Sequence, residues 1–295
     1  GKVHREMPYF KEAIECFDLS EVKKTDTEDF QPHDDIVEIH DAIVCGIKDY
    51  FGKLGFKKAI LGLSGGIDSA VTSTLCAMTG LEVMCLEMPI HQAKSHVSRA
   101  QEHIEQLTKR FPNVSSTRVD LSPVFESFKS EIDLKDTTST VDMALANSRA
   151  RLRMTTLYYY AGLLGKLVAG TGNKVEDFGV GFYTKYGDGG VDLSPIADLL
   201  KSEVYAIGKV LNVPESIMKA APSDGLFGDA RSDEDQIGAS YPELEWAMAQ
   251  EEAGKSASDF SGREAEVMAI YIKFNTSNKH KMLPIPVCAI PSELG

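Results

Sequence analysis

Cysteine and long apolar runs are both scarce in this sequence, and each scarcity argues against a class of protein. The chain of 295 residues has five cysteines, an odd number, and no Cys-x-x-Cys pair. A disulfide framework and a zinc site are therefore not expected, and the cysteines fit a reducing cytoplasm. No apolar run is long enough to span a bilayer, and Gly1–Glu6 lacks the pattern of a signal peptide. We expect a cytoplasmic protein with no membrane partner.

Positive charge is also in short supply. The chain has 31 Lys and Arg residues against 44 Asp and Glu residues, which gives a formal net charge of −13. Proteins that bind nucleic acid present a basic face, so nucleic acid is not an expected partner. A small polyanionic substrate would need a locally basic pocket inside this acidic surface.

The composition changes near residue 32 and divides the chain into two parts. Residues 1–32 are interpreted as an N-terminal extension and linker, with a short strand at 7–10, another at 14–19 and a polar stretch at 21–31. Residues 33–295 are interpreted as one enzymatic domain.

Strand and helix patterns alternate from residue 36 onwards. Apolar positions recur every three or four residues over Ile36–Leu54, which predicts an amphipathic helix that ends at Gly55. The strands expected after it are 58–63, 82–88, 116–121 and 166–170, and the helices are 69–78, 95–111 and 142–164. The alternation predicts an α/β fold, a three-layer, doubly wound parallel sheet with helices on both faces. Ligands of such sheets bind at the carboxyl ends of the strands, which are followed here by 64–69, 89–92 and 171–176.

The segment Leu61–Ser69 joins an apolar strand to a helix through two adjacent glycines. Glycine allows a tight turn, and the free N–H groups at the start of a helix suit a phosphate or pyrophosphate. Serine hydroxyls flank the turn, and Asp68 offers an oxygen ligand for a metal. A Walker A loop is excluded, because the pattern Gly-x-x-x-x-Gly-Lys-[Ser/Thr] is absent. The segment therefore predicts a phosphate-binding loop of another type.

Charged side chains in three later segments suggest the rest of a site. Asn147–Met154 carries three arginines in five residues, which form either an exposed basic helix or a site for an anion. In Gly170–Asp177, which follows a strand, Glu176 could join Asp68 on Mg²⁺. Lys201 begins a helical pattern, where its charge opposes the helix dipole, so we expect an anion beside it.

The stretch Pro222–Ser240 is acidic and rich in glycine. It is either a solvated surface loop or a lid that a substrate orders, and the sequence leaves both interpretations open.

These segments occur in a fixed order along the chain. The order is Ser-Gly-Gly-x-Asp-Ser at 64–69, Asn-x-x-Ala-Arg-x-Arg-Met at 147–154, Gly-Thr-x-x-x-x-Glu at 170–176, Thr-Lys-Tyr-Gly-Asp-Gly-Gly-x-Asp at 184–192, Pro-x-x-x-Leu-x-Lys at 195–201 and His-Lys at 280–281. In this combination the chain resembles the NAD⁺ synthetases of the ATP pyrophosphatase superfamily over residues 36–286. The resemblance fits the ammonia-dependent type, or the synthetase domain of a glutamine-dependent enzyme.

The resemblance implies an adenine nucleotide α-hydrolase-like fold and a reaction in two steps. Deamido-NAD⁺ is adenylated by ATP on its nicotinate carboxylate with release of pyrophosphate, and ammonia then displaces AMP to give NAD⁺. It also implies Mg²⁺, a homodimer with the dinucleotide near the subunit interface, and a glutaminase domain or subunit as a candidate partner. Residues 33–295 would then be the NAD⁺ synthetase domain.

The same resemblance assigns roles to residues of this chain. Asp68, Glu176 and Lys201 would be catalytic, and the two carboxylates would hold Mg²⁺. ATP would be bound by Gly62, Ser64, Gly65, Gly66, Asp68, Ser69, Thr171, Lys201 and Ser223. Deamido-NAD⁺ would be bound by Asn147, Arg151, Lys185, Asp192, His280 and Lys281.

The chain departs from the family pattern in two places. Many relatives carry an arginine just before the proline that follows the second strand, whereas this chain reads Leu-Glu-Met-Pro at 86–89. The acid Glu87 puts that ATP contact in doubt, with Gln92 or Lys94 as substitutes. Gly1–Leu19 resembles the final strands of a nitrilase-like glutaminase, but the chain itself lacks room for that domain, so ammonia is the expected nitrogen source.

Three other functions are weighed against this one. A GMP synthetase-like amidation uses the same loop chemistry. A tRNA thiolase would need reactive cysteine pairs and a basic face, and this sequence has neither. A non-catalytic ATP-binding module could have lost its metal ligands, whereas Asp68 and Glu176 are both present.

Overall fold

A parallel sheet of four strands forms the centre of the computed structural model, which describes residues 4–24, 35–132, 139–223 and 232–290. The strands lie in the order β3-β2-β1-β4. Their bounds are Lys58–Gly62 for β1, Glu82–Glu87 for β2, Val114–Arg118 for β3 and Leu167–Val168 for β4. The chain starts in the middle of the sheet, runs to one edge and then crosses to the other, which is the doubly wound arrangement predicted above.

Helices precede, connect and follow the strands. Before β1 lie α1 (Leu19–Lys24) and α2 (Asp35–Leu54); between the strands lie α3 (Ile67–Met78), α4 (Lys94–Arg110), α5 (Ser122–Glu131) and α6 (Ser139–Leu164). After β4 come the π-helix η1 (Val175–Val180), α7 (Lys201–Val210), α8 (Glu215–Met218), α9 (Asp233–Ile237), α10 (Tyr241–Glu252), the 3₁₀-helix η2 (Ala257–Asp259) and α11 (Gly262–Met282). Within the described part of the chain, no helix is both long and apolar enough to cross a bilayer.

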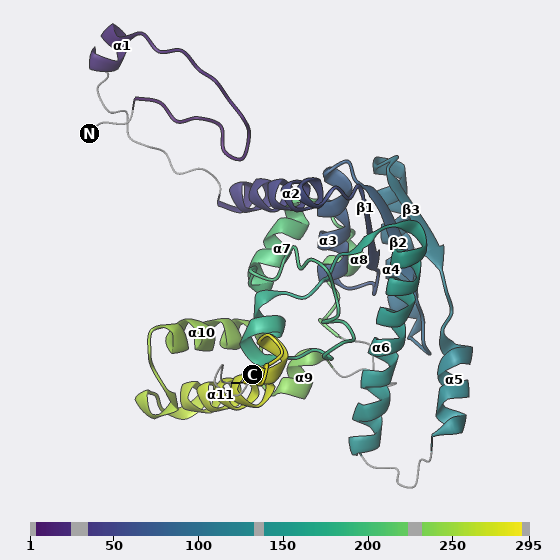
Figure 1. Cartoon of the computed structure of the whole chain (residues 1–295). Coiled ribbons are helices and arrows are strands. Elements are labelled where there is room, and N and C mark those ends of the chain that lie inside the picture. Colours follow the sequence, from purple (N-terminus) through teal and green to yellow (C-terminus); the bar gives the residue numbers. More distant parts are fainter. Residues whose placement is uncertain (1–3, 25–34, 133–138, 224–231, 291–295) are drawn as a thin grey trace.

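Successive residues of the central strands are buried on opposite faces of the sheet. Leu61 of β1 packs with Phe51 of α2 and Leu75 of α3 in one apolar cluster. Ile60, its neighbour in β1, packs instead with Phe125 of α5 in a second cluster, which also contains residues of α6. Helices therefore cover both faces of the sheet (Figure 1), and the strands are apolar on both sides. This confirms the predicted three-layer α/β class.

The residues after β4 build a second, smaller core, which the sequence interpretation did not foresee. Val180 of η1, Leu244 of α10 and Met268 of α11 are fully buried together in it. Figure 1 shows α10 and α11 side by side and away from the sheet, with α9 next to them. Because η1 follows β4 directly, this lobe extends from the carboxyl edge of the sheet, the edge at which ligands are expected.

The strands expected at 7–10 and 14–19 are wrong. The described part of the N-terminal segment contains no strand, and its one helix is α1. Figure 1 shows this segment apart from the sheet, so its backbone has no strand edge with which to form a ladder. Most of the polar stretch 21–31 lies outside the described residues, as do residues 224–231 of the acidic stretch Pro222–Ser240, which contains α9 near its end.

The helix and strand patterns from residue 36 onwards are confirmed, with shifted ends. The predicted helix 36–54 is α2, and the predicted helix 142–164 begins three residues earlier as α6. The third strand lies at Val114–Arg118 and not at 116–121, because its pairing with β2 is set by the alignment of Glu87 with Arg118 at the last position. The fourth strand is short, and a single bridge between Ala169 and Leu193 continues it.

Candidate active site

The turn between β1 and α3 is the predicted phosphate-binding loop. Its backbone requires glycine at one position, because Gly65 has φ of +81° and a Cβ there would lie 2.3 Å from the carbonyl oxygen of His96. The two serines order the loop from within. The Gly66 amide donates to Oγ of Ser64 at 3.2 Å, and the hydroxyl of Ser69 donates to the Gly66 carbonyl at 3.0 Å. The loop therefore holds its shape through its own hydrogen bonds.

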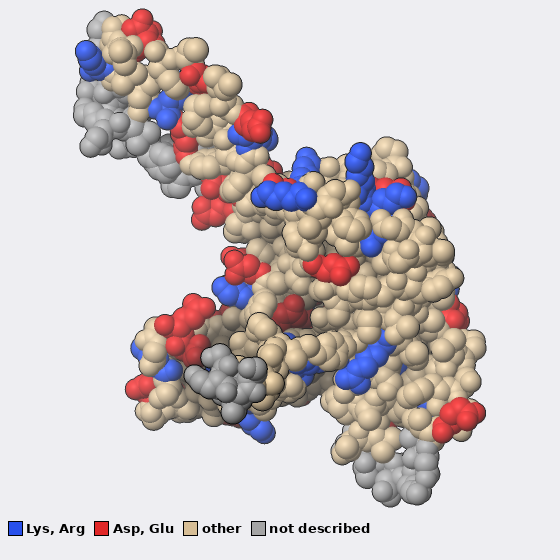
Figure 2. Space-filling view, viewed as in Figure 1, with Lys and Arg blue, Asp and Glu red and all other residues tan. Residues whose placement is uncertain are grey.

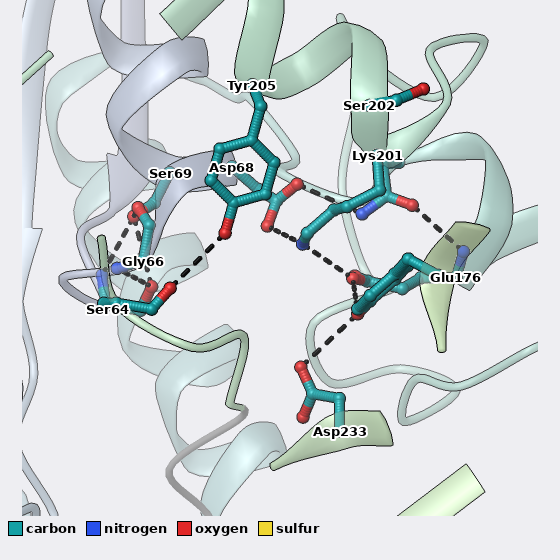
Figure 3. A network of polar contacts seen from close by, with 12 residues as sticks. Ser64, Gly66, Asp68, Ser69, Glu176, Lys201, Ser202, Tyr205 and Asp233 are labelled. Atoms are coloured by element: carbon teal, nitrogen blue, oxygen red, sulfur yellow. Dashed lines mark hydrogen bonds and ion pairs between the residues drawn. The ribbon is translucent and has the colours of Figure 1, made fainter. Parts of the chain in front are cut away.

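Lys201 lies between two carboxylates beside this loop (Figure 3). Its Nζ is 2.6 Å from Oδ2 of Asp68 and 3.0 Å from Oε1 of Glu176. The three residues come from different elements: Asp68 from the first turn of α3, Glu176 from η1, and Lys201 from the first position of α7. The sequence predicted an anion beside Lys201, and the structure provides two from the protein itself.

Neighbouring polar groups fix both carboxylates. The amide of Asn173 donates to Oδ1 of Asp68 at 3.1 Å, and the hydroxyl of Tyr241 donates to Oε1 of Glu176 at 2.6 Å. Tyr241 is the first residue of α10, so it carries this contact from the second lobe to the edge of the sheet. Asp68 and Glu176 are thus held in place before any substrate is present.

Burial and charge shift the pKa values of the three central groups. Burial raises the pKa of Asp68, an effect that Lys201 opposes and the carboxylate of Glu176 reinforces. Burial opposes ionisation of Glu176 as well, but Lys201 and the donors Tyr241 and Asn173 together lower its pKa. Burial disfavours the charge of Lys201, yet the two carboxylates raise its pKa. With all three groups ionised, two negative charges face one positive charge, so the centre retains an attraction for a further cation.

The loop and the carboxylate centre open onto one cavity of about 520 Å³. It lies where the sheet edge, α6, α7 and α11 meet, and Figure 2 shows the surface hollowed between the body of the protein and the lobe of α10 and α11. Eleven residues predicted as site residues line it: Gly62, Ser64, Gly66, Asp68, Ser69, Asn147, Thr171, Glu176, Lys201, Ser223 and Lys281. The structure therefore brings together segments that are more than 200 positions apart in the sequence.

Five predicted residues do not line this cavity: Gly65, Arg151, Lys185, Asp192 and His280. Three of them form a chain of contacts, in which Nε of Arg151 donates to the Lys185 carbonyl at 3.3 Å and Nζ of Lys185 donates to the His280 carbonyl at 2.6 Å. Asp192 accepts hydrogen bonds from the Val168 amide and the hydroxyl of Tyr158.

Glu87, the departure from the family pattern, does not line the cavity. Its side chain is buried and pairs with Nη1 of Arg118 on the neighbouring strand at 2.5 Å. The next residue, Met88, lines the cavity, as does Gln92, whereas Lys94 does not. The acid therefore contributes to strand pairing, and it does not place negative charge in the cavity.

Basic side chains line the cavity inside an acidic protein, as expected for a pocket that binds a polyanionic substrate. Arg153 lines it and donates from Nε to the Met88 carbonyl at 3.0 Å, whereas Arg149 stacks over the ring of Phe125 at 4.7 Å. Arg99 of α4 is a further basic lining residue. The sequence interpretation missed Arg99 and Tyr205, which line the cavity, and Tyr241, which donates to Glu176. Asn173 lies inside the motif Gly170–Glu176, and its place between Thr171 and Glu176 was a usable signal.

The fold and the cavity fit the class of α/β nucleotide-binding enzymes, with the predicted phosphate-binding loop beside a two-carboxylate centre. The family model for NAD synthase matches residues 39–284. The chain belongs to the NAD synthase family, and it is a ligase.

Relatives and solved structures support this assignment. The NH(3)-dependent NAD(+) synthetase of Methanococcoides burtonii is 39% identical over 215 residues, which cover 72% of this chain and 78% of that protein. The structure of the NMN synthetase from Francisella tularensis has a TM-score of 0.73 at 31% identity and covers 90% of this chain and 100% of that one. The NH3-dependent NAD synthetase from Campylobacter jejuni has a TM-score of 0.69 at 26% identity and covers 87% and 100%.

Proposed function

We propose that this chain converts deamido-NAD⁺ to NAD⁺ with ATP and ammonia and releases AMP and pyrophosphate. One observation carries the proposal: the phosphate loop and the Asp68–Lys201–Glu176 centre open onto the same cavity in a member of the NAD synthase family. A nucleotide held by the loop would have its phosphates beside that centre. The cavity therefore suits a reaction at the phosphates of ATP.

ATP is assigned to the sheet side of the cavity. Gly62, Ser64, Gly65, Gly66 and Ser69 would hold its phosphates, because the loop offers hydroxyl groups and the free N–H groups at the start of α3. Thr171, Lys201 and Ser223 line the same cavity and would complete the contacts with ATP.

The residues present fit a magnesium ion. The carboxylates of Asp68 and Glu176 both line the cavity beside Lys201, and oxygen is the ligand that Mg²⁺ prefers. Among the described residues there is no group of three or more His, Cys, Asp or Glu side chains that could hold a metal, so phosphate oxygens and water would supply the other ligands. When bound, Mg²⁺ would offset the charge that develops on the departing pyrophosphate.

The chemistry needs no nucleophilic side chain. An oxygen of the nicotinate carboxylate attacks the α-phosphorus of ATP, the bond to the bridging oxygen breaks, and pyrophosphate leaves. Ammonia then attacks the carbonyl carbon, the bond to the AMP oxygen breaks, and a proton is lost. The chain contributes alignment of the two substrates and positive charge at the phosphates, with Lys201 fixed by its carboxylate partners.

Deamido-NAD⁺ is assigned to the side of the cavity formed by α6 and α11. Asn147 accepts a hydrogen bond from the hydroxyl of Thr184 at 2.7 Å, and Lys281 donates to the carbonyls of Gly181 and Tyr183, so both are held on the cavity wall. The chain Arg151–Lys185–His280 would contact the part of the dinucleotide that extends beyond the cavity. Asp192 is assigned to the same substrate.

A homodimer is part of the proposal. Large apolar side chains are exposed on α2 and α6, among them Leu54, Tyr159 and Leu163. Both helices contact Asp192, because the hydroxyls of Tyr50 in α2 and Tyr158 in α6 donate hydrogen bonds to it. We propose that this apolar face meets a second copy of the chain. A glutaminase partner and a cytoplasmic location stay predictions.

A second candidate is amidation of the mononucleotide, nicotinate mononucleotide. It is favoured by the similarity to the Francisella NMN synthetase over 90% of this chain. It is also favoured by the cavity, which Arg151, Lys185 and His280 do not line. A mononucleotide would not need the part of the surface on which these residues lie.

The proposal is tested by identifying the product that the purified chain forms in the presence of ATP and Mg²⁺. Deamido-NAD⁺ and nicotinate mononucleotide are supplied in parallel, each with ammonium or with glutamine, and the amide, AMP and pyrophosphate are measured together. Amide formed from deamido-NAD⁺ with ammonium supports the proposal, and a higher kcat/KM with the mononucleotide replaces it by the second candidate. If neither acceptor yields an amide, both candidate functions are overturned. Xanthosine monophosphate is then tested as the acceptor of AMP.

A further inference from the structure

Arg99 of α4 lies against the phosphate loop from outside the motifs identified in the sequence. Its Nε donates to the Gly65 carbonyl at 3.0 Å, and its side chain lines the cavity together with Ser64 and Gly66. Helix α4 starts after β2, so this contact joins two different strand-to-helix connections of the sheet. Arg99 thus belongs to the same wall of the cavity as the loop.

The position of Arg99 is set by close backbone packing. At Gly65 the backbone of α4 comes so near that a Cβ would lie 2.3 Å from the carbonyl oxygen of His96 and 3.2 Å from the amide of Ala100. Arg99 lies between these two residues in sequence, and its Nε bond holds the guanidinium beside the Gly65 carbonyl. A guanidinium has five N–H donors, so the bond to Gly65 leaves the terminal amino groups for another acceptor.

No carboxylate of the described residues lies within ion-pair distance of Arg99, unlike Arg118 with Glu87 and Arg263 with Glu243. Part of the guanidinium is buried, and this burial lowers the pKa of Arg99. A cation removed from water costs free energy until an anion is beside it. The arrangement therefore favours a bound anion at this wall of the cavity.

We propose that Arg99 contacts the β- and γ-phosphates of ATP and stabilises their charge as pyrophosphate leaves. The proposal rests on the proposed function for the identity of the anion. A planar guanidinium suits phosphate oxygens through paired N–H donors, and its Nε bond to the loop aligns it before the nucleotide arrives. Arg99 would then be a catalytic residue that touches the leaving group.

Two substitutions separate the charge of Arg99 from its bond to the loop. The amide of Arg99→Gln can still donate to the Gly65 carbonyl but has no charge, whereas Arg99→Lys keeps the charge. The matched control is Arg110→Gln, because Arg110 is on the same helix, donates to the Leu211 carbonyl at 2.9 Å and does not line the cavity. The measurements are the Kd of inorganic pyrophosphate by calorimetry, the kcat/KM for ATP, and the Tm of each variant.

We expect the loss of pyrophosphate binding and of kcat/KM to be larger when the charge at position 99 is removed than when it is kept. Arg99→Gln weakens pyrophosphate binding by about 10-fold or more and lowers kcat/KM by about 100-fold, Arg99→Lys recovers part of both, and Arg110→Gln changes neither. Equal losses in the Gln and Lys variants would overturn the proposal, because the residue would then only brace the loop. Unchanged pyrophosphate binding in Arg99→Gln would overturn it as well.

The outcome stays separate from that of the proposed function. Pyrophosphate binding does not depend on the acceptor of AMP, so an enzyme that makes no NAD⁺ could still show the loss in Arg99→Gln. If Arg99→Gln does not fold, Arg99→Lys decides the matter. A partial loss of pyrophosphate affinity and kcat/KM in the folded Lys variant supports a charge contact, whereas wild-type values or a complete loss of pyrophosphate affinity contradict it.

Discussion

The hydroxyl of Tyr241 donates a 2.6 Å hydrogen bond to Oε1 of Glu176, the same oxygen that lies 3.0 Å from Nζ of Lys201. Tyr241 belongs to α10 and Glu176 to η1, so this bond links the second lobe to the centre of the cavity. Both the hydroxyl and the ammonium donate to one carboxylate oxygen, which fixes the direction in which Glu176 faces the phosphate loop.

Substitution Tyr241→Phe should remove this bond while the ring stays packed. We expect the Mg²⁺ concentration for half-maximal rate to rise by about 10- to 100-fold, because partners of a metal ligand orient it and tune its affinity. Kinetics at several Mg²⁺ concentrations would measure this. The control is Tyr271→Phe, which alters a buried tyrosine of the same apolar cluster away from the cavity. Equal Mg²⁺ dependence in both variants would contradict the role given to Tyr241.

Gly65→Ala should damage the phosphate loop more than a comparable substitution elsewhere. The alanine would have to adopt a positive φ and would bring its Cβ to 2.3 Å from the backbone of His96. We expect a loss of about 2–4 kcal/mol in the free energy of unfolding, with a higher KM for ATP, measured by urea unfolding and steady-state kinetics.

Gly80→Ala is its matched control. Gly80 has the same φ of +81°, but a Cβ there would meet nothing within 4 Å. It should cost about 1 kcal/mol from the backbone conformation alone and leave the KM for ATP unchanged. If Gly65→Ala costs no more than Gly80→Ala, the close approach of α4 to the loop is not what makes glycine necessary.

His103 should make the stability depend on pH in the acidic range. It is buried on α4 and shares a 3.0 Å hydrogen bond with Ser73 of α3. Burial lowers its pKa from 6.5 to about 4, so the folded protein favours the neutral imidazole. Its contribution to stability is complete above pH 6.5 and is lost as the pH falls from 6.5 towards 4, because the unfolded chain then binds the proton first.

The size of this effect follows from the shift. The difference between the pKa values of His103 in the unfolded and the folded chain corresponds to at most about 3 kcal/mol in the free energy of unfolding. Urea unfolding of the wild type and of His103→Gln at pH 5 and pH 7 would measure it. The difference between the two proteins should shrink as the pH is lowered, and a constant difference would show that folding does not lower the pKa of His103.

Lys185→Ala should separate the two candidate substrates. Lys185 donates to the His280 carbonyl and does not line the cavity. If the surface around it binds the outer half of a dinucleotide, the KM for deamido-NAD⁺ should rise by about 10-fold, while the KM for nicotinate mononucleotide and for ATP stays the same. Parallel steady-state assays would decide this, and an equal rise for both acceptors would place Lys185 at the shared nicotinate end.

The local patterns of the sequence were sufficient for most of the fold. The helical patterns predicted α2, α3, α4 and α6, the apolar run at 58–63 predicted β1, and the alternation of strands and helices predicted a sheet covered on both faces. The same reasoning failed for residues 7–10 and 14–19, which have strand-like composition but no neighbouring strand. Residue composition shows only that a segment is compatible with a strand. Whether the strand forms depends on a pairing partner elsewhere in the chain.

The motifs were similarly informative about the chemistry and incomplete about the site. Asp68 and Glu176 were predicted from their residue types and positions after strands, and Lys201 from its position at a helix start, while the family resemblance supplied their roles. The structure places both carboxylates within 3.0 Å of Nζ of Lys201. Arg99 and Tyr241 carried no such signal, because an arginine on an amphipathic helix and a tyrosine at a helix start are ordinary in sequence. Their roles follow from their contacts in the structure, Arg99 with Gly65 and Tyr241 with Glu176.

The sequence by itself determined the order of the elements, the phosphate loop and the set of charged groups available for catalysis. These are local properties, since backbone conformation and apolar periodicity depend on near neighbours along the chain. Only the tertiary structure decided that Glu87 pairs with Arg118 outside the cavity, that Tyr241 reaches Glu176 from a second lobe, and that Arg99 faces the loop. Those contacts depend on how helices pack against the sheet, which brings distant residues together in a way that their spacing does not encode.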